Sequence, residues 1–168
     1  MKPLALLALL ALLAAVLLVV HADFYTNLYY EPTQKYLTTI NYGGVGGTYY
    51  MKAAKDSPEW GICLNCKFLF VTSGLSNGKA AIQNTGNAGT NYHCRDSNNY
   101  IRPIEANIED NCIYDYEVVL DSDNICSYRI AIKADNGLYW KLGGSDNKFI
   151  KATGTSPVYF DVFPLESD

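Results

Sequence analysis

The chain has little of what enzymes and nucleic-acid-binding proteins usually carry. It contains two histidines in 168 residues, and its 13 lysines and arginines face 17 aspartates and glutamates, which gives a formal net charge of −4. Phosphate backbones favour a basic stripe, so we do not expect nucleic acid as a partner. The sequence has no Asn-x-Ser/Thr sequon, so we do not expect N-glycosylation.

Long apolar runs are absent except at the start of the chain. Residues 4–20 are apolar without interruption, follow Lys2, and lead into Val20-His21-Ala22, where small or apolar residues suit signal peptidase. We therefore expect residues 1–22 to be a secretory signal peptide. Residues 23–168 then form one secreted, extracellular domain with no membrane contact after cleavage. An uncleaved anchor is the alternative, because a spanning helix needs about 20 apolar residues.

Five cysteines follow the leader, which is an odd number. The candidates for disulfides are Cys63, Cys66, Cys94, Cys112 and Cys126. Disulfides are expected in the oxidising secretory route, but the spacing does not give the pairing. An odd count leaves one thiol free or bonded to another chain, so a disulfide-linked homodimer is one open arrangement. We expect Cys63-Leu64-Asn65-Cys66 to be structural, with a redox or zinc role as the less favoured alternative.

Amphipathic helix patterns are missing, and short strand-like runs take their place. Tyr, Phe, Val and Ile recur at period two between clusters of Gly, Asn, Asp and Pro, as is typical of strands and turns. The runs lie at residues 68–71, 114–120, 128–132 and 158–163, and the turns at 43–47, 76–78, 135–137 and 143–144. The Asn-Gly pairs favour the positive φ of tight turns. These patterns predict an all-β protein with roughly a dozen strands.

An aromatic-plus-basic motif occurs three times at nearly equal spacing. It reads Tyr50-Met51-Lys52-Ala53, Tyr100-Ile101-Arg102-Pro103 and Phe149-Ile150-Lys151-Ala152, with 50 and then 49 residues between the first positions. A fixed period of this size indicates one supersecondary unit used three times. We place the repeats at about 24–71, 72–120 and 121–168. We expect Tyr36, Tyr50, Tyr100, Tyr139, Trp140 and Phe149 to fill the core.

In each repeat a turn precedes a Tyr-Leu type strand, the aromatic-x-Lys-Ala strand follows, and a Phe-x-Val type strand closes the repeat. This order of motifs resembles the fascin-like, or actin-crosslinking-like, β-trefoil superfamily. The resemblance implies a β-trefoil of three four-stranded repeats, with a pseudo-threefold barrel and a cap of three hairpins. The middle repeat departs from the pattern, with Ala80-Ala81 in place of Tyr-Leu and Pro103 in place of Ala. The family implies binding in general, but the expected secretion excludes actin.

Two further groups of residues could carry chemistry. Asp121 and Asp123 offer oxygen ligands on a turn, but the glycine and the bidentate glutamate of a calcium loop are missing, so we expect no resident metal and no cofactor. A nucleophilic mechanism would need His93 as its base. Its neighbour Cys94 should point to the opposite face of an extended strand, so we expect a solvent-facing loop histidine.

Aromatic and amide side chains in the loops are the remaining signal. Aromatic faces stack on the CH groups of sugars, while amides and carboxylates bond the hydroxyls. The candidate ligand-binding residues are Glu59, Trp60, Asn91, Tyr92 and Asn98. We expect a lectin-like protein that binds extracellular glycans or matrix components and is not an enzyme. The alternatives are an extracellular structural protein of a gel, foam, mucus or mineralised tissue, and a β-trefoil protease inhibitor.

Overall fold

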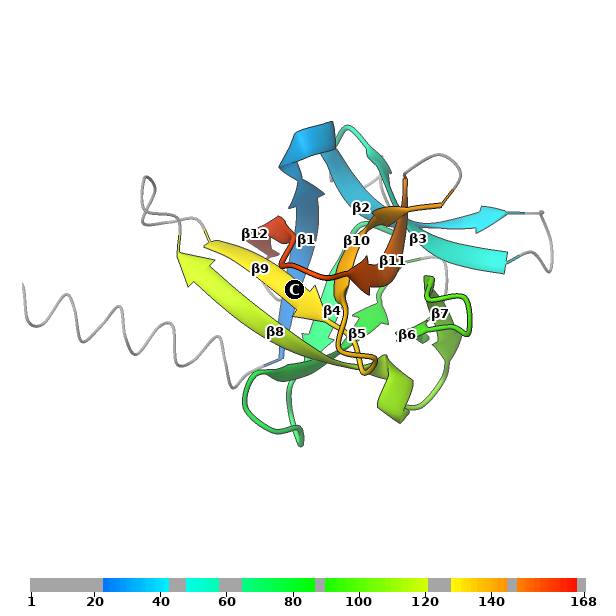
Figure 1. The fold of residues 1–168 in the computed structure, drawn as a ribbon, viewed down its shortest axis with the longest axis vertical. Coiled ribbons are helices and arrows are strands. Elements are labelled where there is room, and N and C mark those ends of the chain that lie inside the picture. Colours follow the sequence, from blue (N-terminus) through cyan, green and yellow to red (C-terminus); the bar gives the residue numbers. More distant parts are fainter. Residues whose placement is uncertain are drawn as a thin grey trace, which may run out of the picture.

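The computed structural model describes residues 23–42, 48–57, 65–86, 90–120, 128–144 and 148–165. Within them the chain is all-β, as the sequence predicts, and twelve strands belong to one sheet (Figure 1). The strands are β1 (Phe24–Tyr30), β2 (Lys35–Tyr42), β3 (Thr48–Lys55), β4 (Phe68–Val71), β5 (Lys79–Asn84), β6 (Tyr92–Arg95), β7 (Ile101–Glu105), β8 (Ile113–Leu120), β9 (Tyr128–Lys133), β10 (Tyr139–Gly143), β11 (Phe149–Gly154) and β12 (Tyr159–Leu165). Two short 3-10 helices, η1 (Glu31–Thr33) and η2 (Asp110–Cys112), join strands.

Six of the strands close a ring. β1 pairs with β12 and β4, β4 pairs with β5, β5 with β8, β8 with β9, and β9 with β12, all antiparallel. The other six strands form the hairpins β2–β3, β6–β7 and β10–β11. Closing a sheet on itself removes the unpaired edges that strand-rich proteins otherwise have to protect.

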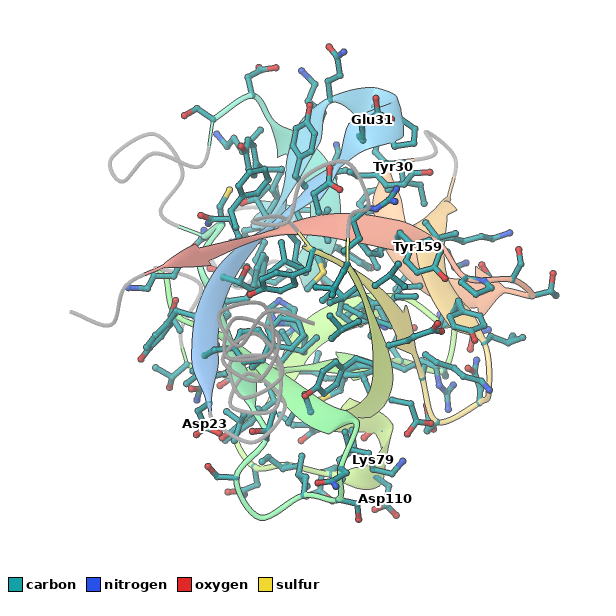
Figure 2. All side chains as sticks on the ribbon, turned by 90° about the vertical axis from the view of Figure 1, so that its left-hand side faces the viewer. Asp23, Tyr30, Glu31, Lys79, Asp110 and Tyr159 are labelled. Atoms are coloured by element: carbon teal, nitrogen blue, oxygen red, sulfur yellow. A yellow bond between two sulfur atoms is a disulfide. The ribbon has the colours of Figure 1, made fainter. Side chains whose placement is uncertain are left out.

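Alternation along the strands decides which side chains enter the core. In β8, Tyr114 and Tyr116 are buried while Asp115 and Glu117 are exposed, as expected for a strand with one face in water. The interior is apolar, and its largest fully buried side chains include Trp140, Tyr114, Phe68, Phe70 and Phe160. Side chains crowd the interior in Figure 2, where Tyr30 and Glu31 lie towards one end of the molecule and Lys79 and Asp110 towards the other.

The three hairpins meet at the repeated aromatic motif. The rings of Tyr50, Tyr100 and Phe149 contact one another with centroids 5.3, 5.5 and 5.8 Å apart. The basic residue of each motif approaches the aromatic ring of another: Lys52 approaches Phe149, Arg102 approaches Tyr50, and Lys151 approaches Tyr100. Cation–π contacts of this kind add to the hydrophobic contact between the hairpins.

The expectation that these aromatic rings fill the core is wrong in part. Trp140 is fully buried, as predicted. The five other expected core rings are only half-buried: Tyr36, Tyr50, Tyr100, Tyr139 and Phe149. The residues one position further along each motif, Met51, Ile101 and Ile150, are fully buried instead. A shift of one residue in a strand moves a side chain to the opposite face.

The middle hairpin also corrects our alignment of the second repeat. Ala80 and Ala81 belong to the ring strand β5 and pair with β8, so they are not the counterpart of the Tyr-Leu pair. In the three hairpins, Leu37 pairs with Ala53, His93 with Pro103, and Trp140 with Ala152. The first residue of each pair follows a tyrosine, and the strand register shifts between that tyrosine and the residue. In the middle hairpin, Tyr92-His93 therefore takes the position of the Tyr-Leu pair.

Pro103 changes one hydrogen bond between the hairpins. The Ala53 N–H donates to the Lys148 carbonyl and the Ala152 N–H donates to the Asn99 carbonyl, both at 2.9 Å. Proline has no N–H, so Pro103 cannot make the third equivalent bond. The Arg102 Nε donates to the Tyr49 carbonyl instead, at 3.2 Å. A side chain therefore satisfies the acceptor that a backbone N–H would otherwise reach.

Gly144 offers a test of how tightly the aromatic contact is packed. Both Gly144 (φ +87°) and Gly137 (φ +78°) adopt a left-handed conformation, but only at Gly144 would a Cβ lie 3.0 Å from the Phe149 ring. Gly137→Ala should cost about 1–2 kcal/mol of backbone strain. Gly144→Ala should cost a further 1–3 kcal/mol or so from overpacking. Urea unfolding of both variants measures the difference, and equal losses would contradict the contact.

Candidate functional site

Three of the five residues that the sequence nominated for ligand binding lie in the part of the chain that the structure describes. Glu59 and Trp60 lie outside the described residues. Asn91 and Tyr92 stand at the start of β6, where Tyr92 is half-buried opposite Glu105. Asn98 is exposed in the turn at the other end of the β6–β7 hairpin, where its N–H donates to Asp96 Oδ1 at 2.8 Å. Of these three described residues, Asn91 and Tyr92 lie together and Asn98 lies apart from them.

His93 is not the solvent-facing loop residue that we expected. It is fully buried in β6, its Nε2 lies 2.9 Å from Thr39 Oγ1, and its ring packs edge-on against Phe68. Burial lowers the pKa of His93 to about 3, because the protonated ring would lose its hydration. A buried neutral imidazole with no access to water is badly placed to act as a general base at the surface.

The cysteines are at least partly structural. Cys94 and Cys112 form a disulfide that ties β6 to η2. Cys66 is buried and is also disulfide-bonded, and its partner lies outside the described residues. The structure does not describe the two remaining cysteines, Cys63 and Cys126, or the calcium candidates Asp121 and Asp123. Across residues 23–165, apart from the five gaps, no three His, Cys, Asp or Glu side chains are placed to hold a metal ion.

A surface cluster of aromatic side chains, which the sequence did not single out, lies over β1, β2 and β12. Tyr29, Tyr36 and Phe163 contact one another, with ring centroids 4.9 Å (Tyr29–Tyr36), 5.9 Å (Tyr36–Phe163) and 6.2 Å (Tyr29–Phe163) apart. Phe163 is 44% exposed, which is high for a phenylalanine, and Tyr29 and Tyr36 are half-buried. We call these three residues the aromatic platform.

Charged groups adjoin the aromatic platform. Asp161 is directly opposite Tyr29 in the β1–β12 pairing and opposite Arg129 in the β12–β9 pairing. The pKa of Tyr36 is raised above its usual value, chiefly by burial and then by the neighbouring Tyr29 and the negative charge of Asp161. Tyr36 therefore keeps its phenolic proton over the whole physiological range and can donate a hydrogen bond. The platform and the adjoining Asp161 together combine apolar faces with a hydrogen-bond donor and a carboxylate.

The second surface feature is a cleft between the β2–β3 and β10–β11 hairpins. Its volume is about 490 Å³, and it is lined by Thr33, Lys35, Lys52, Ala53, Ala54, Leu142 and Lys148. We call it the basic cleft, because every charged residue in the described part of its lining is a lysine. Lys35 and Lys52 lie in sequence motifs that served only to predict the fold. Lys148 lies in the β10–β11 hairpin, far from both along the chain. Their meeting in space was not visible in the sequence.

The chain matches no known protein-family model and no curated protein sequence. In the part of the chain that the structure describes, no helix has both the length and the apolar character needed to cross a membrane.

Proposed function

We propose that this protein is a secreted, non-enzymatic β-trefoil that binds carbohydrate. The observation that carries the proposal is the aromatic platform of Tyr29, Tyr36 and Phe163 beside Asp161. Shallow sugar sites use aromatic faces to stack on CH groups, and adjacent hydroxyls and carboxylates to bond the sugar hydroxyls. The platform is a second candidate site beside the loop residues that we first nominated around Trp60 and Tyr92.

The trefoil assignment is supported by the order of strands. Each run of four consecutive strands contributes two strands to the ring and one hairpin outside it, in the order ring, hairpin, hairpin, ring. The likeness to the fascin-like superfamily is part of the same proposal. Secretion is supported by the signal-like leader and by the Cys94–Cys112 disulfide, since disulfides persist in oxidising compartments. The burial of His93 supports a binding role over a catalytic one.

The carbohydrate proposal can be tested with a glycan array and two matched variants. Phe163 and Leu120 are both exposed hydrophobic residues, 44% and 49%, but only Phe163 belongs to the aromatic platform. Phe163→Ala should weaken binding to the best glycan by roughly tenfold, since an aromatic contact contributes about 0.5–1.5 kcal/mol beyond its buried area. Leu120→Ala should leave binding unchanged. An array on which the wild-type protein binds no glycan would refute the function.

A structural role in an extracellular matrix is the second candidate, favoured by the odd cysteine count. Cys94 is bonded to Cys112 and Cys66 is also bonded, so at least one of the five cysteines lacks an intrachain partner. Such a thiol can link two chains. Under this function the native protein would migrate as a covalent dimer or larger species on a non-reducing gel. A protease inhibitor, the third alternative, would present a taut loop to the protease. The segment from Ser57 to Cys66, which could supply such a loop, lies mostly outside the described residues.

A further inference from the structure

The basic cleft gathers positive charge on a protein whose formal net charge is negative. Three lysines line it, and none of the lining residues that the structure describes is a carboxylate. Lys35 is paired with Asp56, whereas the described residues provide no carboxylate partner for Lys52 or Lys148. Like charges brought together in a concave site raise the local potential and attract anions. The cleft is therefore electrostatically suited to a negative group.

Backbone pairing between two hairpins holds the cleft lysines in place. Phe149 of β11 pairs with Lys52 of β3, and the Ala53 N–H donates to the Lys148 carbonyl at 2.9 Å. Lys148 is therefore fixed beside Lys52, although the two are far apart in the sequence. Ala53 and Leu142 add apolar wall between the charges. A site built on paired strands is more rigid than one built on loops.

Lys52 is also oriented by its own contacts. Its Nζ donates a hydrogen bond to the Tyr42 hydroxyl at 2.6 Å and lies 5.4 Å from the ring centroids of both Tyr42 and Phe149. Tyr42 is 40% exposed, so part of its ring remains open to solvent beside the ammonium group. An ammonium group next to an accessible aromatic face suits a ligand that has both a negative group and CH-rich surface.

We propose that the basic cleft binds the sulfate or carboxylate group of an acidic saccharide. The inference rests on the proposed carbohydrate binding and adds the ligand class: the negative group would lie between Lys52 and Lys148, and a sugar ring would lie against Tyr42. Charge-assisted hydrogen bonds from ammonium groups to such oxygens are stronger than those between neutral groups. The volume of about 490 Å³ falls within the range of small-molecule sites.

Calorimetric titration with three probes tests the ligand class: a sulfated disaccharide, its unsulfated parent, and inorganic sulfate. We expect the sulfated sugar to bind about tenfold more tightly than either of the others, and its affinity to fall as salt is raised. The double variant Lys52→Gln/Lys148→Gln should lose most of this preference. Lys148→Gln alone, at an exposed position, should lose part of it and serves if the double variant is unstable.

Lys79→Gln provides the matched control. Lys79 is paired with Asp115 and lies towards the opposite end of the molecule from Glu31, which begins η1, the 3-10 helix that contains the cleft residue Thr33 (Figure 2). Lys79→Gln removes one positive charge but leaves the cleft residues unchanged. The preference for the sulfated sugar should therefore remain. Thermal unfolding of each variant confirms that it folds.

The outcomes separate this inference from the proposed function. Equal binding of the sulfated sugar and its parent would overturn the acidic ligand and leave carbohydrate binding in place. Equal binding of inorganic sulfate and the sulfated sugar would overturn the saccharide assignment of the cleft. A preference that survives in the Lys52→Gln/Lys148→Gln variant would move the acidic site elsewhere and so refute the cleft. No binding of any sugar, here and on the array, would refute both proposals.

Discussion

Lowering the pH from 6.5 to 4.5 should reduce the free energy of unfolding by about 2 kcal/mol through His93 alone. Burial lowers the pKa of His93 from 6.5 to about 3 in the folded protein. Below pH 6.5 the unfolded chain binds a proton that the folded chain excludes, so each pH unit costs about 1.4 kcal/mol. The contribution of the neutral imidazole is complete above pH 6.5 and is lost progressively as the pH approaches 3.

The aspartates whose pKa values are also shifted titrate at a lower pH than the interval from 6.5 to 4.5. The pKa of Asp135 lies below 3.8, mainly because its carboxylate accepts hydrogen bonds from Arg95. The pKa of Asp23 is also lowered. Burial alone would raise the pKa of Asp23, but its carboxylate accepts hydrogen bonds from Thr72 and Ser73 that outweigh this effect. Their contributions are present above pH 3.8 and are lost below it. The interval from pH 6.5 to 4.5 therefore reports mainly on His93.

Urea unfolding at several pH values measures this slope, and two variants identify its source. His93→Leu places in the second hairpin the residue that the first hairpin has at the equivalent position, Leu37. His93→Gln keeps a polar group near Thr39 and serves if the leucine variant folds poorly. Both should flatten the dependence between pH 6.5 and 4.5, whatever their stability at pH 7. A variant that retains the wild-type slope would show that another group is responsible.

The sequence predicted the strand content of this protein well because the signals were local. The run 68–71 is β4, and the runs 114–120 and 128–132 fall within β8 and β9. Gly78 and Gly137, after asparagine, have the positive φ that their turns require. Period-two alternation and turn chemistry depend on neighbouring residues, so a single sequence contains them.

The strand face on which the aromatic residues of the motif lie was predicted wrongly, although the sequence contained the pattern that gives the correct face. Lys52 is two residues after Tyr50, and residues two apart lie on the same face of a strand. A lysine seldom points into an apolar core, so Tyr50 had to point outward with it and Met51 inward. The abundance of tyrosine suggested an aromatic core. The alternation of the aromatic residue with the charged residue of the motif would have given the correct face.

The surface sites could not be predicted, because each depends on strands that are distant in the sequence. The aromatic platform requires β12 to pair with β1, which places Phe163 beside Tyr29. The basic cleft requires β11 to pair with β3. The equivalence of His93 with Leu37 and Trp140 was hidden by the long segment before β6. Long-range pairing of this kind is set by the whole fold and not by any local pattern.

Trp140→Ala should cause the largest loss of stability in the protein, about 3–5 kcal/mol. Trp140 is fully buried and packs edge-on against Tyr114 with the ring centroids 4.9 Å apart. Tyr114 cannot easily move into the space, because its hydroxyl donates to the His93 carbonyl at 2.8 Å. The cavity would therefore remain, and the cost of removing a large core side chain grows with the volume left empty.

Trp140→Phe separates the packing from the polar atom. Trp140 Nε1 is buried, and the described residues provide no acceptor for it, so its N–H loses hydration without a replacement bond. Phenylalanine removes that group and leaves a smaller cavity. It should cost less than half as much as alanine in urea unfolding. A loss from Trp140→Phe as large as that from Trp140→Ala would show that Nε1 does have a partner, and would place the stabilising contribution of Trp140 in a hydrogen bond and not in the filling of the core.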